Sequence, residues 1–236
     1  MTAPYYADAT TTLYLGDMRE IMPALDHEVD AVVTDPPYGE TTLAWDRWPV
    51  GWPGLVPGNS MWCFGSMRMF LDRRDDFTGW RCSQDVVWEK QNGTGFATDR
   101  FKRVHEHAIH WYRADWRGVY RDVPRVPYIG PDKSSIRRAR PPHTGEIGAH
   151  NYVDDGTRLV RSVIKEPSVR GGLHPTEKPV GILGPLIRYA CPPGGTVLDP
   201  FAGSGSTADA ARASGRRAVL IEAHEPYAEA IARRLS

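Results

Sequence analysis

The sequence lacks any uninterrupted apolar run long enough to cross a bilayer, and residues 1–6 show no basic region followed by an apolar core. These absences argue against a membrane-spanning segment and a secretory signal, so we expect a cytoplasmic protein with no membrane partner. Cysteine is also scarce, and Cys63, Cys82 and Cys191 are widely spaced without a CxxC pair. This pattern favours neither a disulfide framework nor a zinc site, and it predicts buried thiols.

The sequence also has no net charge, because 29 Lys and Arg residues balance 29 Asp and Glu residues. That balance argues mildly against a nucleic-acid-binding protein, but the charges are segregated along the chain. Residues 99–140 contain eleven basic against five acidic residues, and this excess persists unchanged to residue 172. A basic surface beside a neutral body is typical of a protein that binds a polyanion.

The 236 residues, of which 41% are apolar, are sufficient for one α/β domain with an insertion. Short apolar segments alternate with stretches of helical spacing over much of the chain. We expect strands at residues 12–15, 29–34, 60–65, 82–89, 104–112, 196–199 and 218–221, and helices at residues 18–25, 67–72, 181–190 and 208–214.

Residues 194–227 have the pattern of a βαβ nucleotide-binding unit. An apolar strand ends in Asp199, a turn containing Gly203 and Gly205 follows, and after an alanine-rich helix a second apolar strand ends in Glu222. The glycines permit a tight turn and close approach of the backbone to a ligand, while Glu222 is suited to accept hydrogen bonds from ribose hydroxyls. Such a unit normally opens a dinucleotide-binding fold, whereas here it comes last.

Alternative ligands for this loop differ in charge. The spacing Gly203-x-Gly205-x-x-Ala208 also fits the NAD fingerprint, so a dehydrogenase is one alternative, whereas a P-loop is excluded because no lysine follows the glycines. The preceding Asp199 would crowd a pyrophosphate but would pair with a cationic amino acid group, as in S-adenosylmethionine (SAM). An acid that only caps the following helix is the purely structural alternative.

A second strand end, Asp35-Pro36-Pro37-Tyr38, carries a pattern suited to amino-group chemistry. The two prolines stop the strand at residue 34 and leave Asp35 and Tyr38 at its carboxyl end, where ligands bind in open α/β sheets. The Asp35 carboxylate and the Pro36 carbonyl can accept the two hydrogens of a nucleobase amino group and localise its lone pair. Unstacking a base costs a few kcal/mol, and stacking on Tyr38 returns about 1–3 kcal/mol. A Pro-Pro turn with a capping aspartate is the structural alternative.

Together, Thr34-Asp35-Pro36-Pro37-Tyr38-Gly39 and the downstream Asp199-Pro200-Phe201-Ala202-Gly203-Ser204-Gly205 resemble the amino-group DNA methyltransferases of the β order. The resemblance extends from Gly16-Asp17 to the last helix. It implies a Rossmann-like, circularly permuted, SAM-dependent methyltransferase sheet that forms a single domain over residues 1–236. It also implies that residues 45–53 cover the substrate, although a packed surface loop is an equal alternative.

The resemblance assigns residues to two parts of the site. The catalytic residues are Asp35, Pro36, Pro37 and Tyr38. In the cofactor part, Asp17 meets the adenine amino group, Lys178 the methionine carboxylate and Glu222 the ribose hydroxyls, whereas a surface salt bridge is the alternative for Lys178. The methionine and ribose side is held by Asp199, Phe201, Gly203, Ser204 and Gly205. The family loop usually continues with two threonines, and Ser206-Thr207 here retains hydroxyl groups.

Residues 113–172 break the alternation of strands and helices, because prolines interrupt them and aromatic residues are interleaved with arginines. We interpret this stretch as the target-recognition insertion, and a solvated loop is the alternative. Its predicted DNA-binding residues are Arg117, Arg121, Arg125, Arg137, Arg138 and Arg140. We expect no metal site, because His105 and His107 share one face of a strand while His110 faces the other way.

The sequence thus predicts a methyltransferase that flips a base out of double-stranded DNA and methylates an amino group. An aspartate at the first motif position accompanies adenine N6 methylation more often in this family, so N6 of adenine is the predicted target. The alternatives are cytosine N4, RNA, a protein glutamine amide, or a DNA-binding module without activity. A homodimer and a cognate restriction endonuclease are further partners that the resemblance allows.

Overall fold

The computed structural model describes residues 3–94, 98–137 and 150–236. The chain forms two compact units, a larger one of residues Met1–Asp122 and Ser162–Ser236 and a smaller one of Val123–Arg161. The smaller unit falls inside the segment predicted as the target-recognition insertion, and that assignment stays a prediction. No helix among the described residues is long and apolar enough to span a membrane, and the cytoplasmic location stays a prediction.

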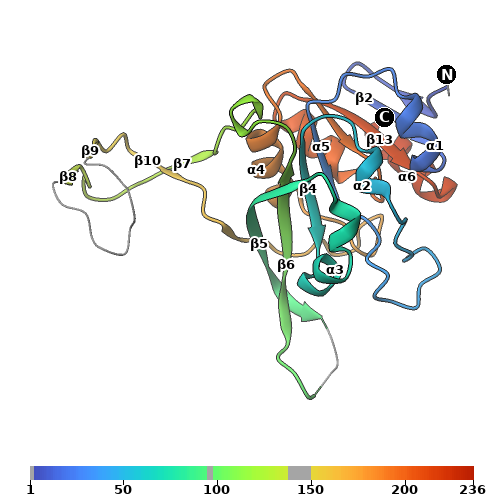
Figure 1. Ribbon diagram of the computed structural model, residues 1–236, viewed down its shortest axis with the longest axis horizontal. Coiled ribbons are helices and arrows are strands. Elements are labelled where there is room, and N and C mark those ends of the chain that lie inside the picture. The colour runs from blue at the N-terminus through green and yellow to red at the C-terminus, as the bar shows by residue number, and fades with distance from the viewer. Residues whose placement is uncertain (1–2, 95–97, 138–149) are drawn as a thin grey trace. The chain divides into compact units, whose positions relative to one another are not determined.

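A nine-stranded sheet forms the centre of the larger unit (Figure 1). In spatial order its strands are β1 (Tyr6–Ala7), β2 (Thr11–Leu15), β13 (Arg217–Glu222), β12 (Thr196–Asp199), β3 (Ala31–Thr34), β4 (Ser60–Gly65), β6 (Arg103–Tyr112), β5 (Arg81–Thr94) and β11 (Val163–Lys165). The C-terminal βαβ unit therefore supplies two interior strands, β12 and β13. This placement accords with the expected α/β sheet, and the circular permutation stays a prediction.

The five strands β2, β13, β12, β3 and β4 run parallel, whereas β6 is antiparallel to both β4 and β5. Their burial explains the nearly continuous apolar runs in the sequence, since all four residues of β3 and of β12 are buried. The carboxyl ends of these parallel strands meet at one edge of the sheet. The amino end of β6 reaches the same edge, because His107 pairs with Gly65 at the end of β4.

Alternate residues of the strands belong to two separate cores, as the two-residue period of a strand requires. Trp62 and Phe64 of β4 pack in one core, and their neighbours Met61 and Cys63 pack in the other. The first core is completed by α4 (Val180–Ala190), α5 (Ser206–Ala213) and α6 (Glu225–Leu235). The second is completed by α1 (Met18–Ile21), α2 (Trp52–Leu55), α3 (Met67–Asp72) and the short helices η1 (Met22–Ala24) and η2 (Arg74–Phe77). Helices thus cover both faces of the sheet.

The smaller unit contains two antiparallel strand pairs, β7 (Arg125–Pro127) with β10 (Thr157–Leu159) and β8 (Ser135–Arg137) with β9 (His150–Tyr152). A remaining short helix, η3 (Trp116–Gly118), precedes this unit in the chain. Arg158 joins the two aromatic residues of the smaller unit, with its guanidinium 3.9 Å from the ring centre of Tyr128 and its Nη1 3.0 Å from the Tyr152 hydroxyl.

Two sequence-based predictions need correction. Cys63 and Cys191 are buried as expected, but Cys82 is exposed, because it lies at the start of the edge-proximal strand β5. The helix predicted over residues 18–25 ends as an α-helix at Ile21 and continues as the 3-10 helix η1, since Pro23 cannot supply the backbone N–H that α-helical bonding requires. The remaining predicted elements are present, with bounds that differ by a few residues.

Candidate active site

A cavity of about 490 Å³ opens at the edge where the parallel strands end, and its volume lies in the usual range for a small-molecule site. It is bordered by the loop after β2, the loop after β3, the loop after β12 and the end of β13. Most of the predicted catalytic and cofactor residues line it, namely Asp17, Asp35, Pro36, Pro37, Tyr38, Lys178, Phe201, Gly203 and Glu222. Residues far apart in the sequence are thus gathered at one place.

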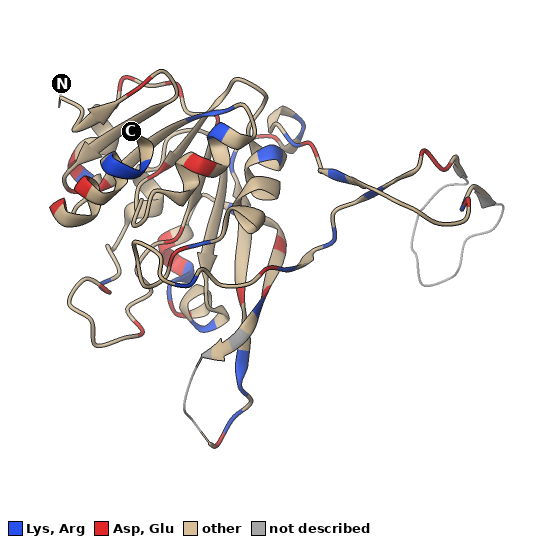
Figure 2. Ribbon diagram, turned by 180° about the vertical axis from the view of Figure 1, so that it is seen from behind, with Lys and Arg blue, Asp and Glu red and all other residues tan. Residues whose placement is uncertain are grey.

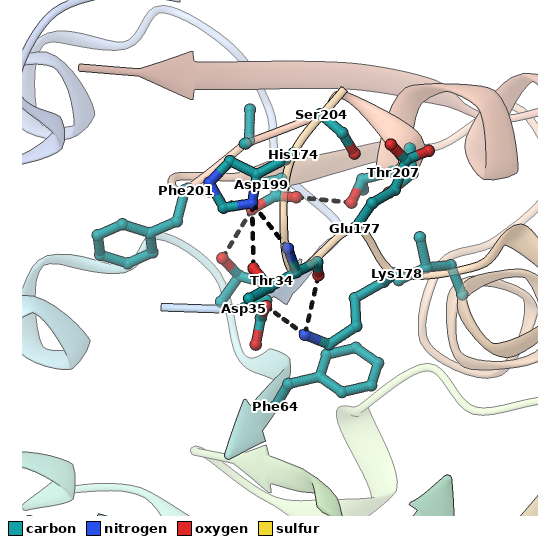
Figure 3. A pocket seen from close by; sticks show the side chains of 15 residues that line it. Thr34, Asp35, Phe64, His174, Glu177, Lys178, Asp199, Phe201, Ser204 and Thr207 are labelled. Carbon is teal, nitrogen blue, oxygen red and sulfur yellow. Dashed lines mark hydrogen bonds and ion pairs between the residues drawn. The ribbon is translucent and has the colours of Figure 1, made fainter. Parts of the chain in front are cut away.

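A second, smaller cavity of about 40 Å³ shares four of these residues and also contacts Asp199 and Ser204. Figure 3 shows its side chains, with Asp199 between Thr34 and Thr207 and the Lys178 ammonium directed at Asp35. Gly205 borders neither cavity. It adopts a left-handed φ of 78°, and a Cβ there would lie 2.9 Å from Ile231 Cγ2, so close helix packing accounts for glycine at this position.

Asp199 is held by three donors at the end of β12. Its Oδ1 accepts hydrogen bonds from the Thr34 hydroxyl at 2.7 Å and the Phe201 backbone N–H at 3.1 Å. Its Oδ2 accepts one from the Thr207 hydroxyl at 2.6 Å. Burial raises the pKa of Asp199 to about 6, although these hydrogen bonds act in the opposite direction.

Glu222 shapes the turn of the glycine-containing loop. Its Oε2 accepts from the Gly203 backbone N–H at 2.8 Å, and its Oε1 accepts from the His224 N–H at 2.9 Å. Burial raises the pKa of Glu222, and the two backbone hydrogen bonds partly offset that rise. Asp17 has a comparable local task, because it caps α1 by accepting from the Arg19 N–H at 2.8 Å.

Asp35 is bound on both carboxylate oxygens. The Tyr38 hydroxyl donates to Oδ1 over 2.6 Å, and the Lys178 ammonium forms an ion pair with Oδ2. Burial raises the pKa of Asp35, while the Lys178 charge opposes that rise. Burial, together with the neighbouring Asp35 charge, also raises the pKa of Tyr38 well above its ordinary value, so the phenol stays protonated and donates to Asp35.

Lys178 has a second acidic neighbour that the sequence analysis did not identify. Glu106 of β6 lines the larger cavity, and its Oε2 lies 3.3 Å from the Lys178 Nζ. Glu106 is also paired with Lys90 of β5. The position of Lys178 next to Asp35 accords with a place in the site, and its predicted contact with the methionine carboxylate stays a prediction.

The aromatic loop after Tyr38 lies at the same cavity. Trp45, Arg47 and Trp48 line it, and the Trp45 ring meets His174 edge-on with ring centres 5.2 Å apart. Asp46 is buried and fixes the loop by accepting from the backbone N–H groups of Gly39 and Thr41, each at 2.7 Å. The loop is therefore packed at the site, and its motion as a cover stays a prediction.

The predicted DNA-binding arginines have different surroundings. Arg117 is exposed in η3, while Arg121 donates to the backbone carbonyls of Trp116 and Val119. Arg125 forms an ion pair with Asp155 at 3.0 Å. The side chain of Arg137, and Arg138 and Arg140 entirely, lie outside the described residues. Figure 2 shows further basic positions along the β5–β6 hairpin, where Lys102 and Arg103 follow Arg100 in the chain.

The three histidines of β6 lie apart from the cavity chemistry. His110 is buried, and its two ring nitrogens face the hydroxyls of Ser60 and Ser83 at 2.9 and 2.6 Å. Burial lowers the pKa of His110 to about 4, so the ring is neutral near pH 7. Within residues 3–94, 98–137 and 150–236, no group of three or more His, Cys, Asp or Glu side chains is arranged to hold a metal ion.

Comparison with known proteins identifies the family to which this chain belongs. The family model described as DNA methylase, named for N6 and N4 methyltransferases, matches residues 29–233. The chain belongs to this DNA methylase family. Its relatives include the Type II methyltransferase M.ScaI of Streptomyces caespitosus, which is 27% identical to this DNA methylase over 260 residues, covering 98% of this chain and 83% of the relative.

Two solved structures show the same fold. The M1.HpyAVI–SAM complex superposes on this DNA methylase with a TM-score of 0.62 at 24% identity, covering 95% of this chain and 99% of the other. PvuII DNA methyltransferase, described as cytosine-N4-specific, gives a TM-score of 0.68 at 15% identity, with coverage of 99% and 89%. The predicted methyltransferase fold and family are confirmed, and the dehydrogenase alternative is set aside. Family membership establishes an amino-group DNA methyltransferase and does not choose between adenine N6 and cytosine N4.

Proposed function

We propose that this DNA methylase transfers a methyl group to the N6 amino group of adenine in double-stranded DNA, after the base has left the helical stack. The observation that carries the proposal is that the Asp35-Pro36-Pro37-Tyr38 loop and the acids Asp17 and Glu222 line one cavity. A methyl donor and a flipped base can therefore meet at the end of β3.

The cofactor predicted from the sequence, S-adenosylmethionine, is that of the family, and the cavity fits it. Its walls offer carboxylates for an ammonium group and ribose hydroxyls, and the left-handed Gly203, with a φ of 54°, brings the backbone close to a ligand. When bound, S-adenosylmethionine supplies an activated methyl group, which the base nitrogen takes up as the bond from sulfur to the methyl carbon breaks. The predicted cofactor residues that line the two cavities would hold it.

Asp35 has the central catalytic part in this proposal. Its carboxylate and the carbonyl of Pro36 accept the hydrogens of the base amino group, which directs the nitrogen lone pair toward the methyl carbon. The methylated nitrogen is positively charged until it loses one of its two hydrogens as a proton. That proton passes to Asp35 or to solvent. Tyr38 holds Asp35 through its hydroxyl at 2.6 Å and offers its ring to the extruded base.

The base is assigned to adenine because an aspartate stands at the first motif position. Cytosine N4 is the second candidate, since Asp35 and Pro36 can accept the two hydrogens of either amino group. Residues 113–172 are proposed to read the target sequence, and the homodimer and the cognate endonuclease stay predictions.

The test uses the full chain, unmethylated DNA and a cofactor labelled in its methyl group, followed by nucleoside digestion and mass spectrometry. We expect label in N6-methyladenine, and an Asp35→Ala loss of about 10²–10⁴-fold, as for a displaced proton acceptor. Label in N4-methylcytosine would overturn the assignment to adenine and leave the proposal of amino-group methylation intact. Label only in RNA or in protein glutamine, supplied as parallel acceptors, or in no acceptor, would overturn DNA methylation by this chain.

A further inference from the structure

Four charged side chains of alternating sign form a row that begins at Asp35. Lys178 contacts Asp35 on one side and Glu106 on the other, and Glu106 is paired in turn with Lys90. Three members are nearly buried, with side-chain exposures of 6% for Lys178 and 11% each for Glu106 and Lys90. We refer to Asp35, Lys178, Glu106 and Lys90 as the charge row.

The sheet topology explains why these residues meet. Asp35 follows β3, and β4 separates β3 from β6 in the sheet. Glu106 precedes His107, the partner of Gly65 at the end of β4, so it stands at the edge where the parallel strands end. On the next strand, Trp88 pairs with Glu106, which places Lys90 two residues further along the same edge. Lys178 enters from the loop before α4, next to its N-cap Pro179.

Burying charged side chains is unfavourable unless each has a partner, so the row requires a compensating benefit. Lys178 sits over apolar rings, with its Nζ 5.2 Å from the centre of Phe64 and 5.8 Å from that of Trp88. Besides these rings, the ammonium has two carboxylates and, at 3.5 Å, the Thr176 backbone carbonyl. The Glu106 Oε2 has no hydrogen-bond partner within the part of the chain described, although it faces Lys178 at 3.3 Å.

We propose that Glu106 is a positioning residue that shares the Lys178 ammonium with Asp35 and thereby sets the basicity of the catalytic carboxylate. If Lys178 had Asp35 as its sole partner, it would hold that carboxylate tightly and reduce its capacity to accept the hydrogens of a base. Without Lys178, burial would raise the pKa of Asp35 further and disfavour its charged form. Glu106, which is also paired with Lys90, competes with Asp35 for the Lys178 ammonium. The ammonium therefore binds Asp35 less tightly than it would in an isolated pair. This inference rests on the proposed function.

Other charged and titratable groups face Asp35 from every neighbouring element. Tyr38 and Lys178 contact it, Glu106 faces it from β6, Asp199 from the end of β12, and His174 from the loop before α4. Burial and the Asp35 charge together raise the pKa of the Cys63 thiol of β4. Burial raises the pKa of Glu106, but the ammonium groups of Lys178 and Lys90 outweigh burial and lower it to about 2. Glu106 is therefore charged throughout the range in which Asp35 titrates.

The test is the pH dependence of kcat/KM for DNA at saturating cofactor, which reports the essential groups of the enzyme–cofactor complex before DNA binds. Lys178→Met removes the cation beside Asp35 and should move the acidic limb to higher pH by about 1–3 units. Glu106→Gln removes the competing acid and should move it to lower pH, by on the order of one unit. Lys178→Arg keeps the cation and should leave the limb near its wild-type position.

Glu89→Gln is the matched control, because Glu89 also lies on this sheet and pairs with a lysine, Lys165, in an exposed ion pair of 3.0 Å. It should leave the limb unchanged. The proposal is refuted if the acidic limb stays in place in both Glu106→Gln and Lys178→Met. It is also refuted if the limb moves in the same direction in both variants. If Lys178→Met weakens binding of S-adenosylmethionine but does not move the acidic limb, Lys178 contacts the cofactor and does not set the basicity of Asp35. If Lys178→Met does not fold, Glu106→Gln compared with Lys178→Arg decides the question.

A second readout separates failure of this inference from failure of the proposed function. Carbon-13 NMR titration of labelled aspartate carboxyls, with the Asp35 signal assigned by its loss in Asp35→Asn, follows the same group without any methyl transfer. Opposite displacements of the Asp35 titration in the two variants support the charge row. Identical titrations overturn it even if wild type methylates DNA. Absence of methyl transfer by wild type overturns the proposed function and the catalytic purpose given to Glu106.

Discussion

The hydroxyl of Thr34 donates a hydrogen bond of 2.7 Å to Oδ1 of Asp199 and so joins the ends of β3 and β12. Thr34 immediately precedes the proposed catalytic loop, and Asp199 begins the glycine-containing loop. Both side chains are buried, and their neighbouring strands are paired in register. The Asp199 carboxylate therefore connects the two motifs, because it accepts a hydrogen bond from Thr34, 165 positions earlier in the sequence.

The titration of Asp199 should govern the affinity for S-adenosylmethionine. Burial raises the pKa of its carboxyl to about 6 from the ordinary 3.8, so the acid is charged above pH 6 and neutral below it. The charged form attracts the ammonium of the cofactor, so affinity should be constant well above that pH and fall about tenfold per unit below it. Calorimetric titration between about pH 5 and 8 measures this. Asp199→Asn should bind more weakly and lose most of the pH dependence, and equal slopes for both proteins would contradict the assignment.

Glu222 and Asp35 should affect the cofactor differently, although both line the larger cavity. Glu222 is already oriented by the N–H groups of Gly203 and His224, and we assign its remaining acceptor capacity to ribose hydroxyls. Glu222→Ala should weaken binding by about 1.5–3 kcal/mol, the usual contribution of hydrogen bonds to a charged group. Asp35→Ala should leave binding nearly unchanged while methyl transfer is lost. Calorimetry on both variants checks this, and equal losses of affinity would show that the two strand ends are misassigned.

Gly205 should be required for packing more than for ligand contact. Both Gly205 and Gly215 have a left-handed φ, of 78° and 71°, but only Gly205 is crowded, since a Cβ would lie 2.9 Å from Ile231 Cγ2. Alanine at either position costs about 1 kcal/mol of backbone strain, and alanine at Gly205 should cost about 1–3 kcal/mol more from overpacking. The free energies of unfolding in denaturant compare the two variants directly. A Gly205→Ala protein as stable as Gly215→Ala would show that α6 moves aside easily.

Local signals explain which parts of the fold could be predicted from the sequence. The helix over residues 67–72 coincides with α3, because Ser66 caps it by accepting from the Met69 N–H at 2.9 Å. The loops that we predict to be catalytic and cofactor-binding were assigned through motif residues that directly follow apolar strands, and the structure places these residues at the ends of β3 and β12. The family resemblance supplied the remaining assignments, because spacing alone also fitted a dehydrogenase.

The charge row could not be predicted, because it depends on strand order rather than on local pattern. Glu106 stands between two histidines in a strand whose neighbours the sequence does not specify. It reaches Lys178, 72 positions later, since β6 runs antiparallel beside β4. Cys82 was misjudged for a related reason, because the burial of a strand terminus depends on which elements cover it.

The last prediction concerns DNA affinity, which we assign in part to Arg137, Arg138 and Arg140. Arg121 and Arg125 already have partners within the protein, so we assign phosphate binding to the basic run of Arg137, Arg138 and Arg140. Alanine at all three positions should flatten the salt dependence of DNA binding, measured by titration at several salt concentrations. The slope should fall by about one for each phosphate that no longer has an arginine partner.

A control with equal loss of charge separates direct phosphate binding from overall electrostatics. Arg188, Arg212 and Arg217 are exposed at the end of the sheet where the parallel strands begin, opposite the cavity, so their joint replacement by alanine should change affinity slightly and leave the slope nearly intact. If both triple variants flatten the slope equally, the basic run does not bind phosphates specifically. If neither does, the run is a solvated loop, and DNA must be bound by other basic residues, of which Arg100, Lys102 and Arg103 on the β5–β6 hairpin would be the next to replace.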